Sequence, residues 1–146
     1  MENTNIWIDI VKKAMKDFYN KEIYIIKDNV SERCLVYNFS KYLERYLKKL
    51  NYNNLNIDLE YNRNCGKAKS TSIQKLAYPD LIVHERENNC NNKLVIEFKK
   101  SNNTRKNVIE HDIEKLNCFK REYGYENVIL IIFDKECEEN VIYKIL

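Results

Sequence analysis

Glycine and proline are scarce in this sequence. Its 146 residues include only two glycines and one proline, so few tight turns are available and helices and strands should dominate. No apolar run approaches the roughly 18 residues of a membrane-spanning helix. The first residues, MENTNIWIDIVKK, lack the basic and apolar regions of a signal peptide. We therefore expect a cytoplasmic protein with no membrane contact.

Paired cysteine motifs are also lacking. The five cysteines include no C-x-x-C pair, and none lies near a histidine at the spacing of zinc ligands. The sequence therefore predicts free thiols rather than a zinc site or a disulfide framework.

Charge is nearly balanced, with a formal net value of +3, but it is unevenly distributed. The segment 62–75 carries Arg63, Lys67, Lys69 and Lys75 and no acidic residue. Such a segment is a candidate for contacts with the phosphates of a polyanion, and ordinary surface charge is the alternative. The length and the 44% hydrophobic content suit one domain spanning residues 1–146.

Hydrophobic periodicity predicts helices followed by three strands, then a helix and two strands. Apolar residues at helical spacing predict helices over 5–20, 32–50 and 107–124, the last ending at Gly124. Alternating or continuous apolar runs predict strands over 55–63, 80–84, 93–100, 127–134 and 139–146. The run EIYIIK at 22–27 is too short to assign. In the strand at 55–63, alternation places Leu55, Ile57, Leu59 and Tyr61 on one side.

The strand KLVIEFKK at 93–100 contains charges where an apolar core strand is expected. Alternation sends Glu97 and Lys99 to the same face. A buried charge costs several kcal/mol unless it is paired or bound to a metal. Either this strand emerges into solvent at Glu97, or the two charges belong to a site.

A second charged position favours a site. Pro79-Asp80 opens the preceding strand, and the short asparagine-rich turn between the two strands predicts that they are antiparallel neighbours. That pairing brings Asp80 beside Glu97 and Lys99. Two carboxylates are typical ligands of Mg²⁺ or Mn²⁺, and a nearby lysine can hold the attacking water or the charge that develops on a phosphate. Such a site hydrolyses phosphodiesters.

Glu32 is an unusual residue on the apolar side of its helix. Ser31 is a good N-cap, and Glu32 lies on the same stripe as Leu35 and Phe39. A carboxylate in the first turn interacts favourably with the helix dipole. The stripe also points toward the sheet, and this position favours Glu32 as a residue of the site.

Pro79-Asp80 followed by Glu97-Phe98-Lys99, after a helix that carries Glu32, resembles the PD-(D/E)xK nuclease superfamily. The resemblance implies the restriction-endonuclease-like α/β fold, with an αβββαβ core and a mixed sheet flanked by helices. The segments that resemble small stand-alone bacterial members, over residues 31 to about 133, are SERCLVYNFSKYL, DLEYNRN, YPDLIVHER, KLVIEFKKS and Asp112-x-x-Lys115-Leu116.

By this resemblance, Asp80 and Glu97 are the expected metal ligands, Lys99 the catalytic lysine and Glu32 an added site carboxylate. Candidate DNA contacts are Arg63, Lys67, Lys69 and Lys100. Glu60 and Arg63 can belong to the site or to an exposed strand face, and His84 is more typical of a structural histidine than of a general base. The tyrosines indicate core packing, with base stacking as the alternative.

The leading hypothesis is a magnesium-dependent deoxyribonuclease, an endonuclease that hydrolyses phosphodiester bonds of DNA. One alternative is a non-catalytic nucleic-acid-binding or assembly module on the same fold. Another is a structural or regulatory subunit in which the strand charges form an internal ion pair. A single site cuts one strand, so a double-strand cutter of this size would be a homodimer or a subunit of a larger system.

Overall fold

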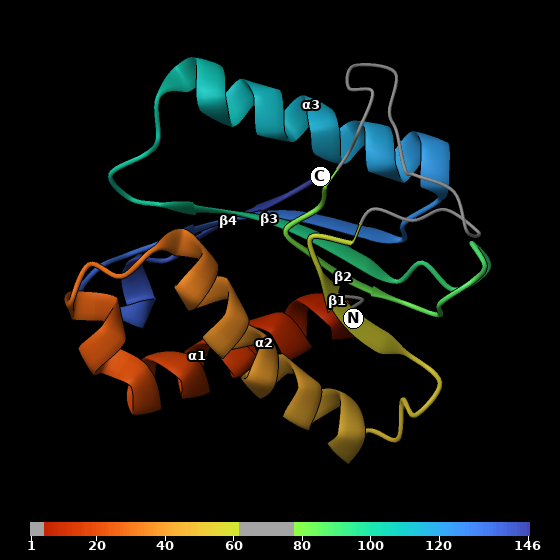
Figure 1. Cartoon of the computed structure of the whole chain (residues 1–146), viewed down its shortest axis with the longest axis horizontal. Helices are drawn as coiled ribbons and strands as arrows, with labels where there is room; N and C mark the ends of the chain where they lie inside the picture. The colour runs from red at the N-terminus through yellow and green to blue at the C-terminus, as the bar shows by residue number, and fades with distance from the viewer. Residues whose placement is uncertain (1–4, 62–77) are drawn as a thin grey trace.

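The fold is a mixed five-stranded sheet with helices on both faces (Figure 1). The computed structural model describes residues 5–61 and 78–146. Its elements in chain order are α1 (Ile6–Lys27), α2 (Glu32–Lys49), β1 (Asn56–Leu59), β2 (Leu81–His84), β3 (Leu94–Lys100), α3 (Lys106–Tyr123), β4 (Asn127–Phe133), the short 3-10 helix η1 (Glu138–Asn140) and β5 (Ile142–Ile145). The α/β class predicted from the sequence is confirmed.

The strands lie in the order β1-β2-β3-β4-β5. Neighbours are antiparallel except for β3 and β4, which are parallel and are connected through α3. The antiparallel pairing of β2 with β3 was predicted from the short turn between them and is confirmed.

Two hydrophobic clusters cover the two faces of the sheet. Helices α1 and α2 lie on one face and α3 on the other (Figure 1). Along β3, Leu94, Ile96 and Phe98 pack in the α1 and α2 cluster, whereas Val95 packs with Leu116 of α3. The alternation predicted for this strand is therefore confirmed, and Glu97 and Lys99 belong to the α3 face.

Helix α1 is longer than the sequence predicted. It continues through the unassigned run at 22–27 and ends at Lys27, with non-helical backbone angles at Glu22 (φ −117°, ψ 26°). The Tyr42 hydroxyl donates to Glu22 Oε1 at 2.8 Å, and Ile26 is buried. The kink at Glu22 allows the last turns of α1 to keep Ile26 in the core. A short apolar run in the sequence does not reveal such a kink.

Strand β1 is shorter than predicted, and Tyr61 does not share a side with Leu55, Ile57 and Leu59. Those three pack on the α1 and α2 cluster, but Tyr61 packs on the α3 cluster. Glu60 between them has φ +49°, a left-handed conformation that interrupts the alternation of a strand. The prediction of one common side was therefore wrong at Tyr61.

The ends of α2 and α3 follow the predicted signals. The Ser31 side chain accepts a hydrogen bond from the Cys34 N–H at 3.2 Å. Gly124 has φ +68°, and its N–H donates to the Lys120 carbonyl at 3.2 Å. Both caps satisfy backbone groups that a helix end leaves without partners.

Within residues 5–61 and 78–146, no helix has the length and apolar character needed to cross a membrane. Likewise, no disulfide joins the cysteines at positions 34, 90, 118 and 137.

His84 is a structural residue in β2. It is buried, and its Nε2 lies 2.7 Å from Asp58 Oδ2 of β1. Arg86 also donates to Asp58, from Nε at 3.0 Å and from Nη2 at 2.6 Å. Burial by itself would raise the pKa of Asp58, but the hydrogen bonds from His84 and Arg86 bring it well below its usual range.

We predict that Asp58→Asn lowers the free energy of unfolding by about 1–3 kcal/mol near neutral pH, because the three hydrogen bonds of its charged carboxylate with His84 and Arg86 are weakened. The pKa of Asp58 is depressed in the folded state. Its contribution is therefore present above the unfolded pKa of about 3.9 and is lost as the pH falls through the folded value. Urea denaturation from neutral to acidic pH measures this difference.

Glu114→Gln, at an exposed position in the middle of α3, is the matched control and should change stability little at any pH. An Asp58→Asn deficit that stays constant down to acidic pH would contradict the charge-based explanation.

Candidate active site

The site lies where β3 extends beyond β2. The pairing of these strands ends at Leu81 with Ile96, whereas β4 pairs with β3 as far as Lys100. Beyond β2, two carboxylates accept hydrogen bonds from the backbone of β3. Asp80 Oδ2 accepts from the Phe98 N–H at 2.8 Å, and Glu32 Oε2 accepts from the Lys100 N–H at 3.2 Å. Acidic side chains thus take the place that a longer β2 would occupy.

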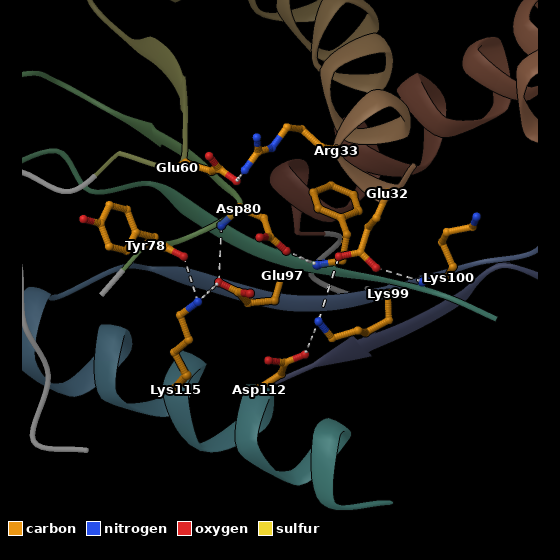
Figure 2. Close-up of polar contacts among 11 residues, drawn as sticks. Glu32, Arg33, Glu60, Tyr78, Asp80, Glu97, Lys99, Lys100, Asp112 and Lys115 are labelled. Atoms are coloured by element: carbon orange, nitrogen blue, oxygen red, sulfur yellow. Dashed lines mark hydrogen bonds and ion pairs between the residues drawn. The ribbon is translucent and has the colours of Figure 1, made fainter. Parts of the chain in front are cut away.

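Glu97 lies at the centre of the site and is 2% exposed. Its Oε1 accepts from the Asp80 N–H at 3.3 Å and forms an ion pair with Lys115 Nζ at 2.9 Å. Lys115 also donates to the Tyr78 carbonyl at 2.7 Å (Figure 2). The alternative in which the strand emerges into solvent at Glu97 is therefore wrong.

Lys99 lies on the same strand face, between two carboxylates. Its Nζ is 3.1 Å from Asp112 Oδ2 of α3 and 3.9 Å from Glu32 Oε1 of α2 (Figure 2). Burial lowers the pKa of Lys99, but the charges of Asp112 and Glu32 outweigh it and raise the pKa above its usual value. The ammonium is thus held charged in a half-buried place.

Three carboxylates of the site have raised pKa values. Burial is the largest cause for Glu32, Asp80 and Glu97, and the charge of Asp80 raises the pKa of the other two further. Burial raises the pKa of Glu97 well above its usual value, although the charge of Lys115 opposes this rise. Such crowded, poorly solvated carboxylates favour a cation beside them.

The structure brings the four sequence-predicted residues together: Glu32 lies in α2, Asp80 directly before β2, and Glu97 and Lys99 in β3. Of the candidate DNA contacts, Arg63, Lys67 and Lys69 lie outside the described residues. Lys100 turns its ammonium to Asn29 Oδ1 at 2.7 Å and the Val30 carbonyl at 2.8 Å.

Asp112 and Lys115 occur in a segment that resembles the superfamily, but the sequence predicted no role for either residue. They are buried, and they are the α3 partners of Lys99 and Glu97. The sequence feature that could have identified them is the same as for Glu32, a charged residue on the apolar side of a helix. Both lie among the apolar positions Ile109, Leu116 and Phe119, where charged residues are out of place unless they are paired.

The family model of the archaeal Holliday junction resolvase (Hjc) matches residues 63–145, more than half of the chain. The chain belongs to this family. The Hjc family is a group of DNA nucleases within the PD-(D/E)xK superfamily, so the predicted superfamily and the restriction-endonuclease-like fold are confirmed. The match gives no support to the narrower resemblance to bacterial members. No curated protein and no solved structure matches the chain.

The range matched by the family model contains most of the site residues, but not all of them. It includes Asp80, Glu97, Lys99 and the two α3 residues, Asp112 and Lys115, but it begins after Glu32. The carboxylate from α2 is therefore contributed by a part of the chain that the family model does not cover.

The donor set fits a hard divalent cation. Within residues 5–61 and 78–146, no three His, Cys, Asp or Glu side chains are gathered as a complete metal cage. Asp80 and Glu97 supply two adjacent carboxylates, and Mg²⁺ commonly takes only one or two of these and leaves its other positions to water and phosphate. When all are ionised, the four site carboxylates and two ammonium groups carry a net charge of two negative units, which the two positive charges of one such ion would balance.

We predict that Lys115→Met lowers the free energy of unfolding by about 3–5 kcal/mol near neutral pH, because it leaves Glu97 buried without its cation. The pKa of that carboxyl is raised in the folded state. The deficit should therefore shrink as the pH is lowered and the carboxyl takes up a proton. Urea denaturation of the variant at several pH values measures it.

The double variant Glu97→Gln with Lys115→Met should recover much of this loss, which a double-mutant cycle quantifies. Additive losses in the double variant would show that the two side chains do not act as a pair.

Proposed function

We propose that this protein is a metal-dependent endonuclease that cuts DNA at four-way junctions. The observation that carries the proposal is the convergence of Asp80, Glu97, Lys99 and Glu32 at the end of one buried strand, in a chain of the Hjc family. The family match supports a DNA junction as the substrate, and the gathered carboxylates and lysine support phosphodiester hydrolysis as the reaction.

Asp80 and Glu97 are the proposed ligands of Mg²⁺ or Mn²⁺. Such an ion, when bound, polarises the phosphate and lowers the pKa of bound water. Asp80 is suited to this role because its Oδ2 is held by a main-chain N–H, and Glu97 because Lys115 fixes its Oε1. Both carboxylates are thereby oriented before a substrate arrives.

Lys99 is the proposed catalytic lysine. Hydrolysis joins a water oxygen to phosphorus and breaks the bond to one ester oxygen, which finally receives a proton. Negative charge accumulates on the phosphoryl oxygens during this exchange, and the ammonium of Lys99 can donate hydrogen bonds to them. Glu32, whose pKa is raised by burial, is positioned near Lys99 to accept a proton or a hydrogen bond from the attacking water.

Asp112 is proposed as the residue that positions Lys99, and Lys115 as the one that positions Glu97. The basic residues Arg63, Lys67, Lys69 and Lys100 are proposed to contact DNA phosphates. A four-way junction is resolved by two cuts related by twofold symmetry, whereas residues 5–61 and 78–146 of one chain form one such site. We therefore propose that the protein, as a single domain over residues 1–146, acts as a homodimer.

A non-catalytic DNA-binding module on the same fold remains the second candidate, and its test is the cleavage assay itself. A module of this kind would bind the junction and leave every phosphodiester bond intact in the presence of Mg²⁺ or Mn²⁺.

We predict that the wild-type protein cuts a synthetic four-way junction with Mg²⁺ or Mn²⁺ and not with a chelator. Asp80→Asn and Lys99→Met should each reduce the single-turnover cleavage rate by at least about a hundredfold, because each removes a charged group from the reacting site. Gel separation of end-labelled strands measures the rate. Asp9→Asn is the control and should cut normally. Undiminished cleavage by Asp80→Asn, or full activity in chelator, would refute the assignment.

Glu32→Gln separates a catalytic from a helix-end role. If Glu32 serves the site, cleavage should fall at least about tenfold, equivalent to about 1.4 kcal/mol of barrier. The pKa of Glu32 is raised in the folded state, so replacing it with a neutral group should leave the melting temperature unchanged or raise it near neutral pH. Calorimetry and the cleavage assay together measure both effects.

Glu44→Gln, at an exposed position on the same helix, is the matched control. A Glu32→Gln variant that melts a few degrees lower and cuts at the wild-type rate would assign Glu32 to the helix end alone.

A further inference from the structure

A cavity of about 310 Å³ adjoins the candidate active site between the first turns of α2 and the end of β1. Glu32 and Asp80 form part of its wall, so one boundary is shared with the site. Arg33 and Glu60 also line the cavity, and Figure 2 shows them on the side of Asp80 away from Asp112 and Lys115. Whatever occupies the cavity therefore lies beside the carboxylates that act on the phosphate.

The remaining wall is apolar and aromatic. Val36 is buried, Leu59 is half-buried, and Tyr37 is 55% exposed. These side chains offer little to a bare phosphate, but they suit a flat heteroaromatic ring. Pockets for small ligands have volumes from roughly 300 Å³ upward, so this one can receive a single base but not a base pair within a stacked duplex.

Charges at the rim suit a nucleotide. Arg33 and Glu60 form a salt bridge of 2.8 Å, with side chains that are 79% and 49% exposed. An exposed pair of this kind is weak and is exchanged easily for other partners. The ammonium of Lys41 lies 4.5 Å from the centre of the Tyr37 ring. Cations are thus available for phosphates next to a surface that suits the base.

The backbone at the cavity is also unusual. Glu60 lies on the wall and has φ +49°. Strained residues of this kind concentrate at functional sites. The turn at Glu60 leaves Leu59 at the cavity while sending Tyr61 to the other face of the sheet.

We propose that this cavity receives one unstacked DNA base next to the phosphate that is cut, with Tyr37 as its stacking partner. This inference rests on the proposed junction-cutting function. At a branch point the continuous stacking of a duplex is interrupted, so a base there is released at lower cost than a base within an arm. The cavity thereby makes binding at the active site depend on branched DNA, and a continuous duplex lacks a base to fill it.

The test combines a variant of the protein with a missing base in the DNA. A four-way junction is bound in chelator, so that no cutting occurs, and fluorescence anisotropy gives the dissociation constant. Tyr37→Ala should weaken binding about five- to hundredfold, as expected for the loss of one base and aromatic stack. Tyr37→Phe, which keeps the ring, should bind like the wild type. Binding of a linear duplex should change less than twofold in either variant.

Junctions with one abasic nucleotide, placed in turn at each position that flanks the branch, identify the base. At one position the wild-type protein should lose as much affinity as Tyr37→Ala loses on the intact junction. Tyr37→Ala should then lose nothing further on that abasic junction, because the same contact is already absent.

Tyr24→Ala is the matched control, since Tyr24 is 76% exposed on α1 and lies away from the cavity wall. Three outcomes would overturn the inference. Tyr37→Ala could lose no affinity, it could lose as much affinity for a linear duplex as for a junction, or its loss could add to that caused by the abasic nucleotide. Those outcomes would leave the proposed function standing if the wild type still cuts junctions with metal. A wild type that never cuts would refute the proposed function instead.

Discussion

The difference in length between β2 and β3 is the constraint on which the site depends. Because β2 ends at Leu81 on this side, the N–H groups of Phe98 and Lys100 need other acceptors, and Asp80 and Glu32 provide them. Main-chain donors are fixed by the sheet, so the carboxylates they hold are fixed as well. The parallel partner β4 supports the same stretch of β3 from its other edge. The geometry of the site is thus a property of the sheet.

Three layers then contribute charge to that strand end. Helix α2 provides Glu32, the sheet provides Asp80, Glu97 and Lys99, and α3 provides the two partners that pair with Glu97 and Lys99. The strand charges Glu97 and Lys99 are paired, but their ion-pair partners lie on α3 and α2 and not on the strand itself, and the acidic groups are left in excess. Pairing by α3 compensates charges that would otherwise be too costly to bury, and the excess of acidic groups is compatible with the divalent cation proposed for this site.

The sequence predicted those parts of the site that depend on local rules. Alternation along β3 and a short turn were enough to place Asp80, Glu97 and Lys99 together, and an apolar stripe was enough to bring Glu32 close. It could not predict the pairing of Asp112 and Lys115, because the rotation of a crossover helix over the sheet is set by tertiary packing. The left-handed Glu60 was also missed, since glycine or asparagine is the usual residue there. The cavity beside it is a space between two elements, and no local pattern marks such a space.

The use of main-chain donors has a consequence for how this enzyme can diverge. Asp80 and Glu32 are anchored by the peptide groups of residues 98 and 100, not by the side chains at those positions. The Lys100 side chain turns instead to the loop between α1 and α2, where it contacts Asn29 and Val30. Evolution can therefore replace the residue at position 100, and with it the surface presented there, while the anchoring of the carboxylates persists. The proposed catalytic residues and a proposed DNA contact thus share one strand, yet they can change independently.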